Sequence, residues 1–176
     1  MLQCDNPFWR FSLAVYAAPG VAPECLALQD TRGIDVNMLL FCAWLGSLRV
    51  VLTGEDLAAV EATVRSWREQ VVLPLRGVRR DIKARPDAVQ DDIAALRKDV
   101  AALELRAEQI EQAMLYAMAA HLNAPAATMT AAEVVRRNVS LLLARRDAIE
   151  PACLIEAALA HASDPTSDRG ATSACA

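Results

Sequence analysis

Apolar residues recur along most of the chain at spacings of three and four, the period of an α-helix with one buried face. The longest such pattern covers residues 54–121 and is divided by Pro86. Its first half follows Thr53 and Asp56, which fit a capping box, and it contains Pro74, which predicts a kink. The short junction around Pro86 predicts that the two halves form an antiparallel helical hairpin.

Shorter helices are predicted on both sides of this hairpin. Start and stop signals place three N-terminal helices at about 7–18, 22–31 and 36–48. The third is apolar almost all round, as expected of a central helix that is surrounded by others. Two further helices are expected at about 130–145 and 148–162.

Together these elements predict an all-α fold, a helical bundle with a long antiparallel helical hairpin. The expected organisation is a helical core domain over 1–122, made of three short helices and the hairpin. A C-terminal helical pair over 123–163 follows a Pro-containing linker. Ser, Thr, Asp, Pro and Gly then predict a flexible tail over 164–176.

Composition places this fold in a cellular context. With 55% hydrophobic residues, the 176-residue chain is too apolar to be a disordered protein. Its five cysteines are odd in number and contain no Cys-x-x-Cys pair, which indicates reduced thiols. We find no secretion signal and no apolar stretch of ~20 residues, so we expect a soluble cytoplasmic protein without a transmembrane segment.

The motifs that usually carry chemistry are absent from the sequence. It has no glycine-rich phosphate loop and no Gly-x-Ser-x-Gly elbow. His121 and His161 are the only histidines, and neither has a cysteine or histidine at metal-ligand spacing. We therefore predict no metal and no cofactor, we assign no catalytic residue, and we favour a non-catalytic protein.

Unusual residue choices concentrate between Asn6 and Trp44, in the pattern NPFW…FSL…VY…PGV…CL.LQD..G.DVN.LLF..W. This pattern resembles the N-terminal signature of a small uncharacterised proteobacterial family of helical proteins, a conserved domain of unknown function. The resemblance covers roughly the first two thirds of the chain. It implies a helical fold and brings no activity, substrate or cofactor with it.

Polar side chains in this apolar segment need hydrogen-bond partners if they are buried. One interpretation is that Gln29 and Asn37 tie neighbouring helices together. The other interpretation is a ligand pocket between the first three helices. Acid–base catalysis by Asp30 in this pocket is disfavoured, because no second titratable residue is identified beside it. The residues of that candidate pocket are Trp9, Tyr16, Gln29, Asp30, Asn37 and Trp44.

The formal net charge is −4, but charge is distributed unevenly. Residues 65–85 carry seven basic and two acidic side chains, whereas 87–111 carry seven acidic and three basic ones. This complementarity favours pairing within the hairpin over nucleic-acid binding, which a pI of about 5.2 also disfavours.

The regular apolar stripe of the hairpin leads to the main functional hypothesis. A stripe too long for the short helices to cover would require another chain, so we predict contact with a protein partner or self-association. The expected contact residues are Arg76, Arg79, Arg80, Leu96, Val100 and Leu103. The protein would then be an interaction or regulatory protein that acts through 54–121; the alternative is a small-molecule binding protein or enzyme with the N-terminal pocket.

Overall fold

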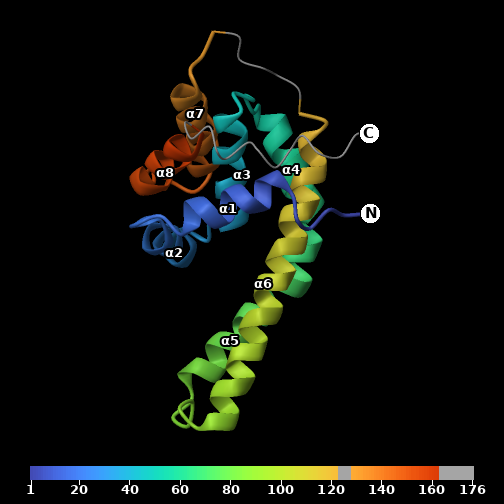
Figure 1. The fold of residues 1–176 in the computed structure, drawn as a ribbon, viewed down its shortest axis with the longest axis vertical. Coiled ribbons are helices and arrows are strands. Elements are labelled where there is room, and N and C mark those ends of the chain that lie inside the picture. The colour runs from blue at the N-terminus through green and yellow to red at the C-terminus, as the bar shows by residue number, and fades with distance from the viewer. Residues whose placement is uncertain (123–127, 163–176) are drawn as a thin grey trace.

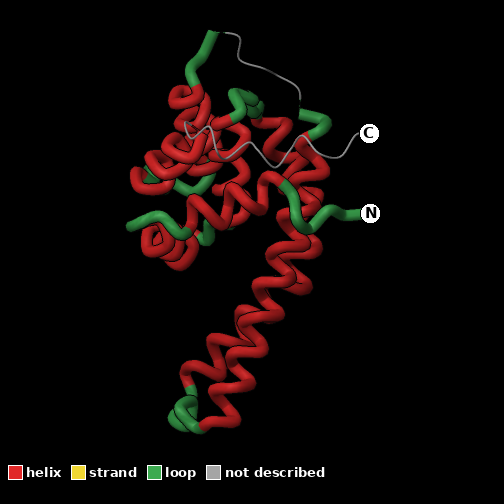
Figure 2. Tube along the Cα trace, in the orientation of Figure 1, coloured by secondary structure: helices red, strands yellow, loops and turns green. Residues whose placement is uncertain are grey.

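The structure is a computed structural model that describes residues 1–122 and 128–162. Every regular element in these two ranges is a helix, as Figure 2 shows. The predicted all-α fold is therefore confirmed. The expected flexible tail, 164–176, lies outside the described residues.

The helices form a compact body from which one hairpin projects (Figure 1). In chain order they are α1 (Pro7–Tyr16), α2 (Val21–Arg32), α3 (Val36–Ser47), α4 (Gly54–Trp67), the π-helical turn η1 (Arg68–Val72), α5 (Leu73–Ala84), α6 (Asp91–Ala119), α7 (Ala131–Ala144) and α8 (Ala152–Ala162). The body contains α1–α3, α7 and α8, and α4 runs beside the upper part of α6. Below the body, α5 and the first half of α6 pack on each other and extend away from the other helices.

The helix starts lie where the capping residues predicted them. The side chain of Asn6 accepts a hydrogen bond from the Trp9 amide at 2.8 Å, and Asp35 accepts one from the Asn37 amide at 3.0 Å. Thr53 forms a complete capping box at the start of α4, and α7 begins with a second such box. Each cap satisfies amides that have no partner inside the helix.

The middle of the hairpin differs from a simple kinked helix. The π-helical turn η1 continues without a break into α5, whose second residue is Pro74. The amide of Leu73 bonds to the carbonyl of Arg68, five residues earlier, so the hydrogen-bond register changes just before the proline, which has no amide hydrogen. Beyond α5, the junction 85–90 is longer than expected, because α6 begins only at Asp91. Val89 therefore lies in this loop and is 88% exposed.

The core is built around α3, which is buried on nearly every side as its sequence predicted. Its closest neighbour is α7, and Gly46 makes this approach possible: a Cβ at that position would lie 2.5 Å from the Cα of Val135. Side chains from α7 and α8 join those of α1–α4 in one hydrophobic cluster. The boundary proposed at residue 122 stays a prediction, while the packing unites these helices around α3.

A buried amide joins α7 to the segment that follows α3. Asn138 is fully buried and accepts a hydrogen bond from the amide of Leu52 at 3.0 Å. Its own amide group donates to the carbonyl of Val50 at 2.8 Å. Asn138 thus satisfies backbone groups of a connecting segment that would otherwise lose water without gaining a partner.

The described helices include one bent pair with membrane-spanning length and composition. No single described helix is both long and apolar enough to cross a bilayer. Within residues 1–122 and 128–162, only α1 and α2 together reach that length and composition, and they are bent by 99° at their junction.

Candidate functional site

A cavity of about 210 Å³ lies where the hairpin leaves the body. Residues from α1, α2 and α3 form one side, and residues from α5 and α6 form the other. The wall combines aromatic, aliphatic, amide and charged groups: Trp9, Ser12, Leu13, Tyr16, Leu26, Gln29, Val36, Asn37, Leu40, Arg76, Arg79, Glu104, Leu105, Glu108 and Gln112. Apolar surface together with convergent polar groups is what a small-molecule site requires.

Four of the six residues predicted for a ligand pocket line this cavity: Trp9, Tyr16, Gln29 and Asn37. The other two lie elsewhere. Trp44 is 7% exposed and packs against the rings of Phe8 and Phe41 in the core. Asp30 is exposed and forms an ion pair with Arg80 across the gap between α2 and α5.

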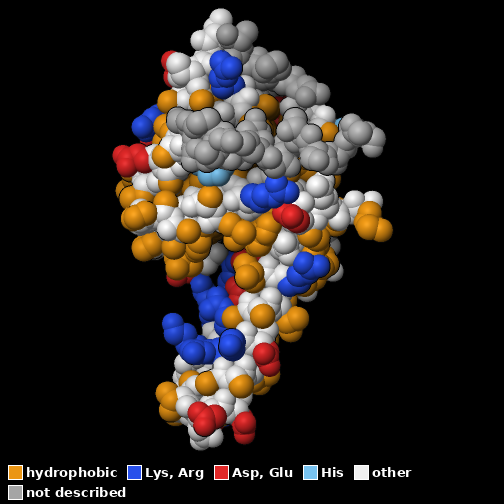
Figure 3. Space-filling model, viewed as in Figure 1, with side chains coloured by type: hydrophobic (Ala, Val, Ile, Leu, Met, Phe, Trp, Pro, Cys, Tyr) orange, Lys and Arg blue, Asp and Glu red, His pale blue; other side chains and the backbone are white. Residues whose placement is uncertain are grey.

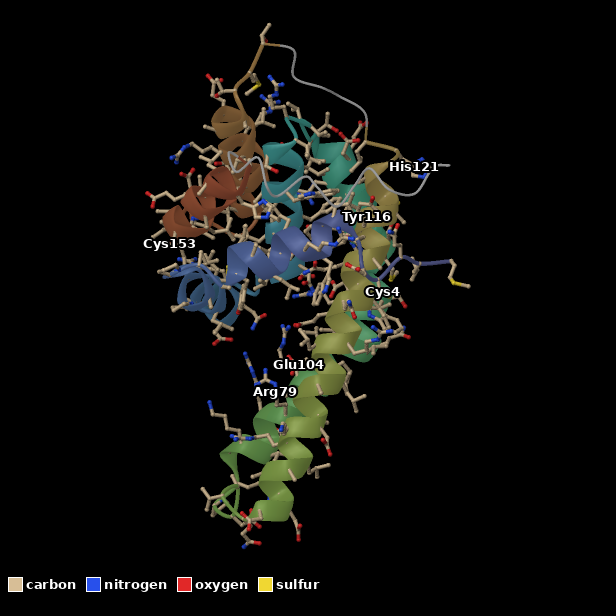
Figure 4. The ribbon with its side chains drawn as sticks, viewed as in Figure 1. Cys4, Arg79, Glu104, Tyr116, His121 and Cys153 are labelled. Carbon is tan, nitrogen blue, oxygen red and sulfur yellow. The ribbon has the colours of Figure 1, made fainter. Side chains whose placement is uncertain are left out.

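An ionic cluster on α5 and α6 forms the hairpin side of the cavity. Arg76 donates from Nε to Glu104 at 2.9 Å, from Nη1 to Gln29 at 2.7 Å and from Nη2 to Glu108. Arg79 donates to Glu104 from two nitrogens, and Figure 4 shows these two side chains together between α5 and α6. Charge-matched pairing within the hairpin is thereby confirmed. Gln29 also confirms the interpretation that polar side chains tie helices together, here α2 to α5.

The cluster decides the charge state of its carboxylate. Burial raises the pKa of Glu104, but hydrogen bonds from Arg79 and Arg76 and their positive charges outweigh it, so the pKa is lowered overall. The Glu104 side chain is only 7% exposed and remains an anion held by two cations. The two arginines and Glu104 therefore form a structural ion cluster.

The partner-binding set stays a prediction, and the structure places its six residues in different surroundings. Arg76 and Arg79 are bound to Glu104, with side chains 12% and 31% exposed, and Val100 is 8% exposed. Three of the predicted residues remain on the surface. Leu96 and Leu103 are 54% and 58% exposed, and the Arg80 side chain is 52% exposed beside Asp30.

A second buried network joins α3 to α6 behind the cavity. The Asn37 amide group donates to Glu111 at 2.8 Å, and the Gln112 amide group donates to Asn37 at 2.9 Å. Arg68 forms an ion pair with Asp35 at 2.7 Å next to this network. Asn37 thus acts as a tie between helices, as the first interpretation of these polar residues expected.

Glu111 is the most strongly perturbed acid of this network. Burial, followed by the nearby carboxylate of Asp35, raises the pKa of Glu111 to about 9. The Asn37 amide and the charge of Arg68 oppose this shift in part. At neutral pH, Glu111 is therefore a protonated acid. Its side chain is fully buried and does not line the cavity, so its perturbed pKa reflects a structural network.

Two side chains of the cavity wall have a buried oxygen without a hydrogen-bond partner among the described residues: Oγ of Ser12 and Oε1 of Gln112. Both residues are 3% exposed. Neither residue was predicted as part of a site, because Ser12 and Gln112 occur within helices whose pattern predicted only packing. Their signal lies in three dimensions, where α1 and α6 meet.

The described cysteines offer no activated nucleophile in the core. Cys25 and Cys42 are fully buried free thiols. Burial, assisted by the charges of Glu24 and Glu61 respectively, raises the pKa of each thiol to about 12. Both stay protonated at neutral pH and serve as packing residues.

A second, smaller cavity of about 150 Å³ lies between α3, α4 and α7. Four arginines and three acids line it: Arg65, Arg68, Arg145, Arg146, Asp35, Glu61 and Glu69. Arg68 is bound to Asp35, and Arg145 to Glu61 at 2.7 Å. In the two described ranges, no group of three or more His, Cys, Asp or Glu side chains could hold a metal ion.

The comparisons with known proteins add one match. A family model described as "Protein of unknown function (DUF2390)" matches residues 7–115. This range contains the signature segment and most of the hairpin, and it confirms the resemblance to a conserved domain of unknown function. The search of curated proteins and the search of solved structures found no match.

Proposed function

Since this chain belongs to the DUF2390 family of proteins of unknown function, we propose its role from its own surface: it is an interaction protein that self-associates through α6 of the projecting hairpin. The observation that carries the proposal is the pair Leu96 and Leu103, which are 54% and 58% exposed. They lie seven residues apart and therefore on one face of the helix. We call this pair the leucine seam.

The position of the leucine seam supports a chain-to-chain contact. It lies on the part of the hairpin that extends below the body, where the described helices leave the outer face of α6 uncovered (Figure 1). Figure 3 shows hydrophobic side chains on the surface of this projecting part beside charged ones. Large apolar side chains repeated along an exposed helix are a typical contact surface.

A second copy of the chain fits the charges around the seam. If two α6 helices pair antiparallel with Leu96 of one opposite Leu103 of the other, residue 92 of one copy faces residue 107 of the other. Asp92 then lies beside Arg106 of the second copy, and the same contact recurs by symmetry. Opposite charges beside an apolar seam set the orientation of paired helices.

The test is sedimentation of the full chain from about 1 µM to about 300 µM, a range that covers micromolar association. We expect a concentration-dependent dimer, and we expect Leu96→Gln with Leu103→Gln to weaken it by at least about 100-fold. Full burial of a leucine contributes about 1.5–3 kcal/mol, and each seam leucine, a little over half exposed, can contribute about half of that. A dimer contains four of them. Circular dichroism checks that the variant keeps its helices.

The matched control is Leu105→Gln. Leu105 is 51% exposed on the same helix, but two residues beyond Leu103 it points about 200° away. The Leu105→Gln substitution should therefore leave the dimer unchanged. A wild-type chain that stays monomeric over the whole range overturns the proposal, as does a dimer that the seam variant leaves intact.

A further inference from the structure

We propose that the cavity between α1, α3 and the base of the hairpin is a binding site for a small neutral aromatic molecule that carries an amide-type edge. The site is separate from the leucine seam, because neither Leu96 nor Leu103 lines the cavity. Ligand binding and self-association can therefore be tested independently.

The size and the apolar walls of the cavity suit an aromatic ring. Its volume of about 210 Å³ exceeds the ~150 Å³ of an engineered apolar cavity that takes up benzene. Trp9, Leu40 and Leu105 supply aromatic and aliphatic surface from three different helices. Leu105 is 51% exposed, so it lies at the rim, where a ligand would enter.

The unpartnered polar atoms specify the edge of the ligand. Oε1 of Gln112 can only accept a hydrogen bond, and its own amide group already donates to Asn37. Oγ of Ser12 can donate or accept. A ligand that offers an N–H to Gln112 and a C=O to Ser12 satisfies both buried atoms, and a carboxamide or lactam carries these two groups side by side. Burying such atoms without partners is unfavourable, so a ligand that supplies both hydrogen bonds should bind more tightly than one that does not.

The charged residues of the wall favour a neutral ligand. Two cations, Arg76 and Arg79, face two anions, Glu104 and Glu108, so the formal charges cancel. Each of the three guanidinium nitrogens of Arg76 already donates a hydrogen bond, to Glu104, Gln29 and Glu108 respectively. An anionic ligand would have to displace one of these carboxylates. A cationic ligand would compete with arginines for Glu104.

Three fragments of one shape but different charge test the proposal: benzamide, benzoate and benzamidine. Each is titrated into the full chain while ¹H–¹⁵N spectra are recorded. We expect saturable shifts with benzamide at the amides of α1 and α6 that flank the cavity. Benzoate and benzamidine should bind at least tenfold more weakly, because they bring a charge and only one type of hydrogen-bonding group.

Two variants with matched controls localise the binding. Ser12→Ala removes one hydrogen bond to the ligand and should weaken benzamide binding about fivefold to tenfold. Ser66→Ala, at an exposed position on α4, is the matched control and should not weaken binding. Leu105→Trp at the rim should fill the entrance and abolish binding, whereas Leu48→Trp, at an exposed position outside the cavity, should leave it unchanged.

The outcomes that overturn the proposal are distinct. Benzamide that never saturates means that the cavity holds only solvent. Benzoate or benzamidine that binds as tightly as benzamide excludes the neutral amide class. Benzamide binding that survives Leu105→Trp in a folded protein places the ligand elsewhere.

Discussion

The buried carboxyl of Glu111 makes the stability of the protein depend on pH in an unusual direction. Glu111 is fully buried, accepts a hydrogen bond from Asn37 and has a pKa raised to about 9, chiefly by burial and then by Asp35. Glu111→Gln keeps the shape of the side chain. Its oxygen can still accept from Asn37, and its amide group can donate towards Asp35. The substitution removes only the ability to ionise.

The direction in which stability changes with pH follows from the protonation of Glu111 in the folded and unfolded states. In the unfolded chain Glu111 loses its proton near 4.5, whereas the folded protein keeps it until about pH 9. Unfolding between these values releases a proton, so the stabilising effect of Glu111 is complete below 4.5 and is lost as pH rises. At about 1.4 kcal/mol per pH unit, the 2.5 units from 4.5 to pH 7 amount to about 3 kcal/mol. Glu111→Gln should avoid this loss.

The assay is urea unfolding followed by circular dichroism, for wild type and variant, at several pH values from 4.5 to 8.5. We expect similar unfolding free energies near pH 4.5 and a Gln variant more stable by about 3 kcal/mol at pH 7. Glu156→Gln, at an exposed position on α8, controls for the removal of one negative charge. A Glu111→Gln effect that does not grow with pH would refute the assignment of a protonated Glu111.

Packing and ionic contacts give further predictions. Gly46→Ala should destabilise the protein by about 2 kcal/mol or more, because the new Cβ would meet the Val135 backbone at 2.5 Å. A Cβ at Gly77 would meet nothing within 4 Å, so Gly77→Ala should stabilise α5 by about 0.5–1 kcal/mol. If urea unfolding gave the same change in free energy for Gly46→Ala and Gly77→Ala, the predicted contrast between the two glycines would be wrong. Glu104→Ala should cost about 3 kcal/mol and speed amide exchange in α5, since Arg79 loses its partner; unchanged exchange would contradict the ion cluster.

Much of the fold could be predicted because its signals are local. Helix starts depend on a side chain three residues or fewer from the amide it caps, so Asn6, Asp35 and Thr53 were recognisable in the sequence. The apolar character of α3 likewise predicted its central place. The length of the junction 85–90 was harder to predict from the sequence, because Val89 continues the apolar spacing of α6 although it lies outside that helix.

The candidate site was harder to predict because its parts come from distant segments. Trp9 and Trp44 look alike in an apolar helical pattern, yet Trp9 lines the cavity and Trp44 packs in the core. Helical periodicity gives the face of a residue but not the neighbour that the face meets. Ser12 and Gln112 are separated by 100 residues, so only their meeting across α1 and α6 makes them a site.

Polar contacts at the base of the hairpin determine what both proposals require, a fixed direction of α5 and α6 relative to the body. Gln29 binds Arg76, Asp30 binds Arg80, and the body helix α3 reaches α6 through buried hydrogen bonds. Apolar packing is non-directional, whereas a buried polar group left without its partner is costly, so the buried contacts among these disfavour other orientations. Two of these residues, Gln29 and Arg76, also line the cavity. A ligand that bridges α1 and α6 would therefore strengthen the orientation in which the leucine seam faces away from the body.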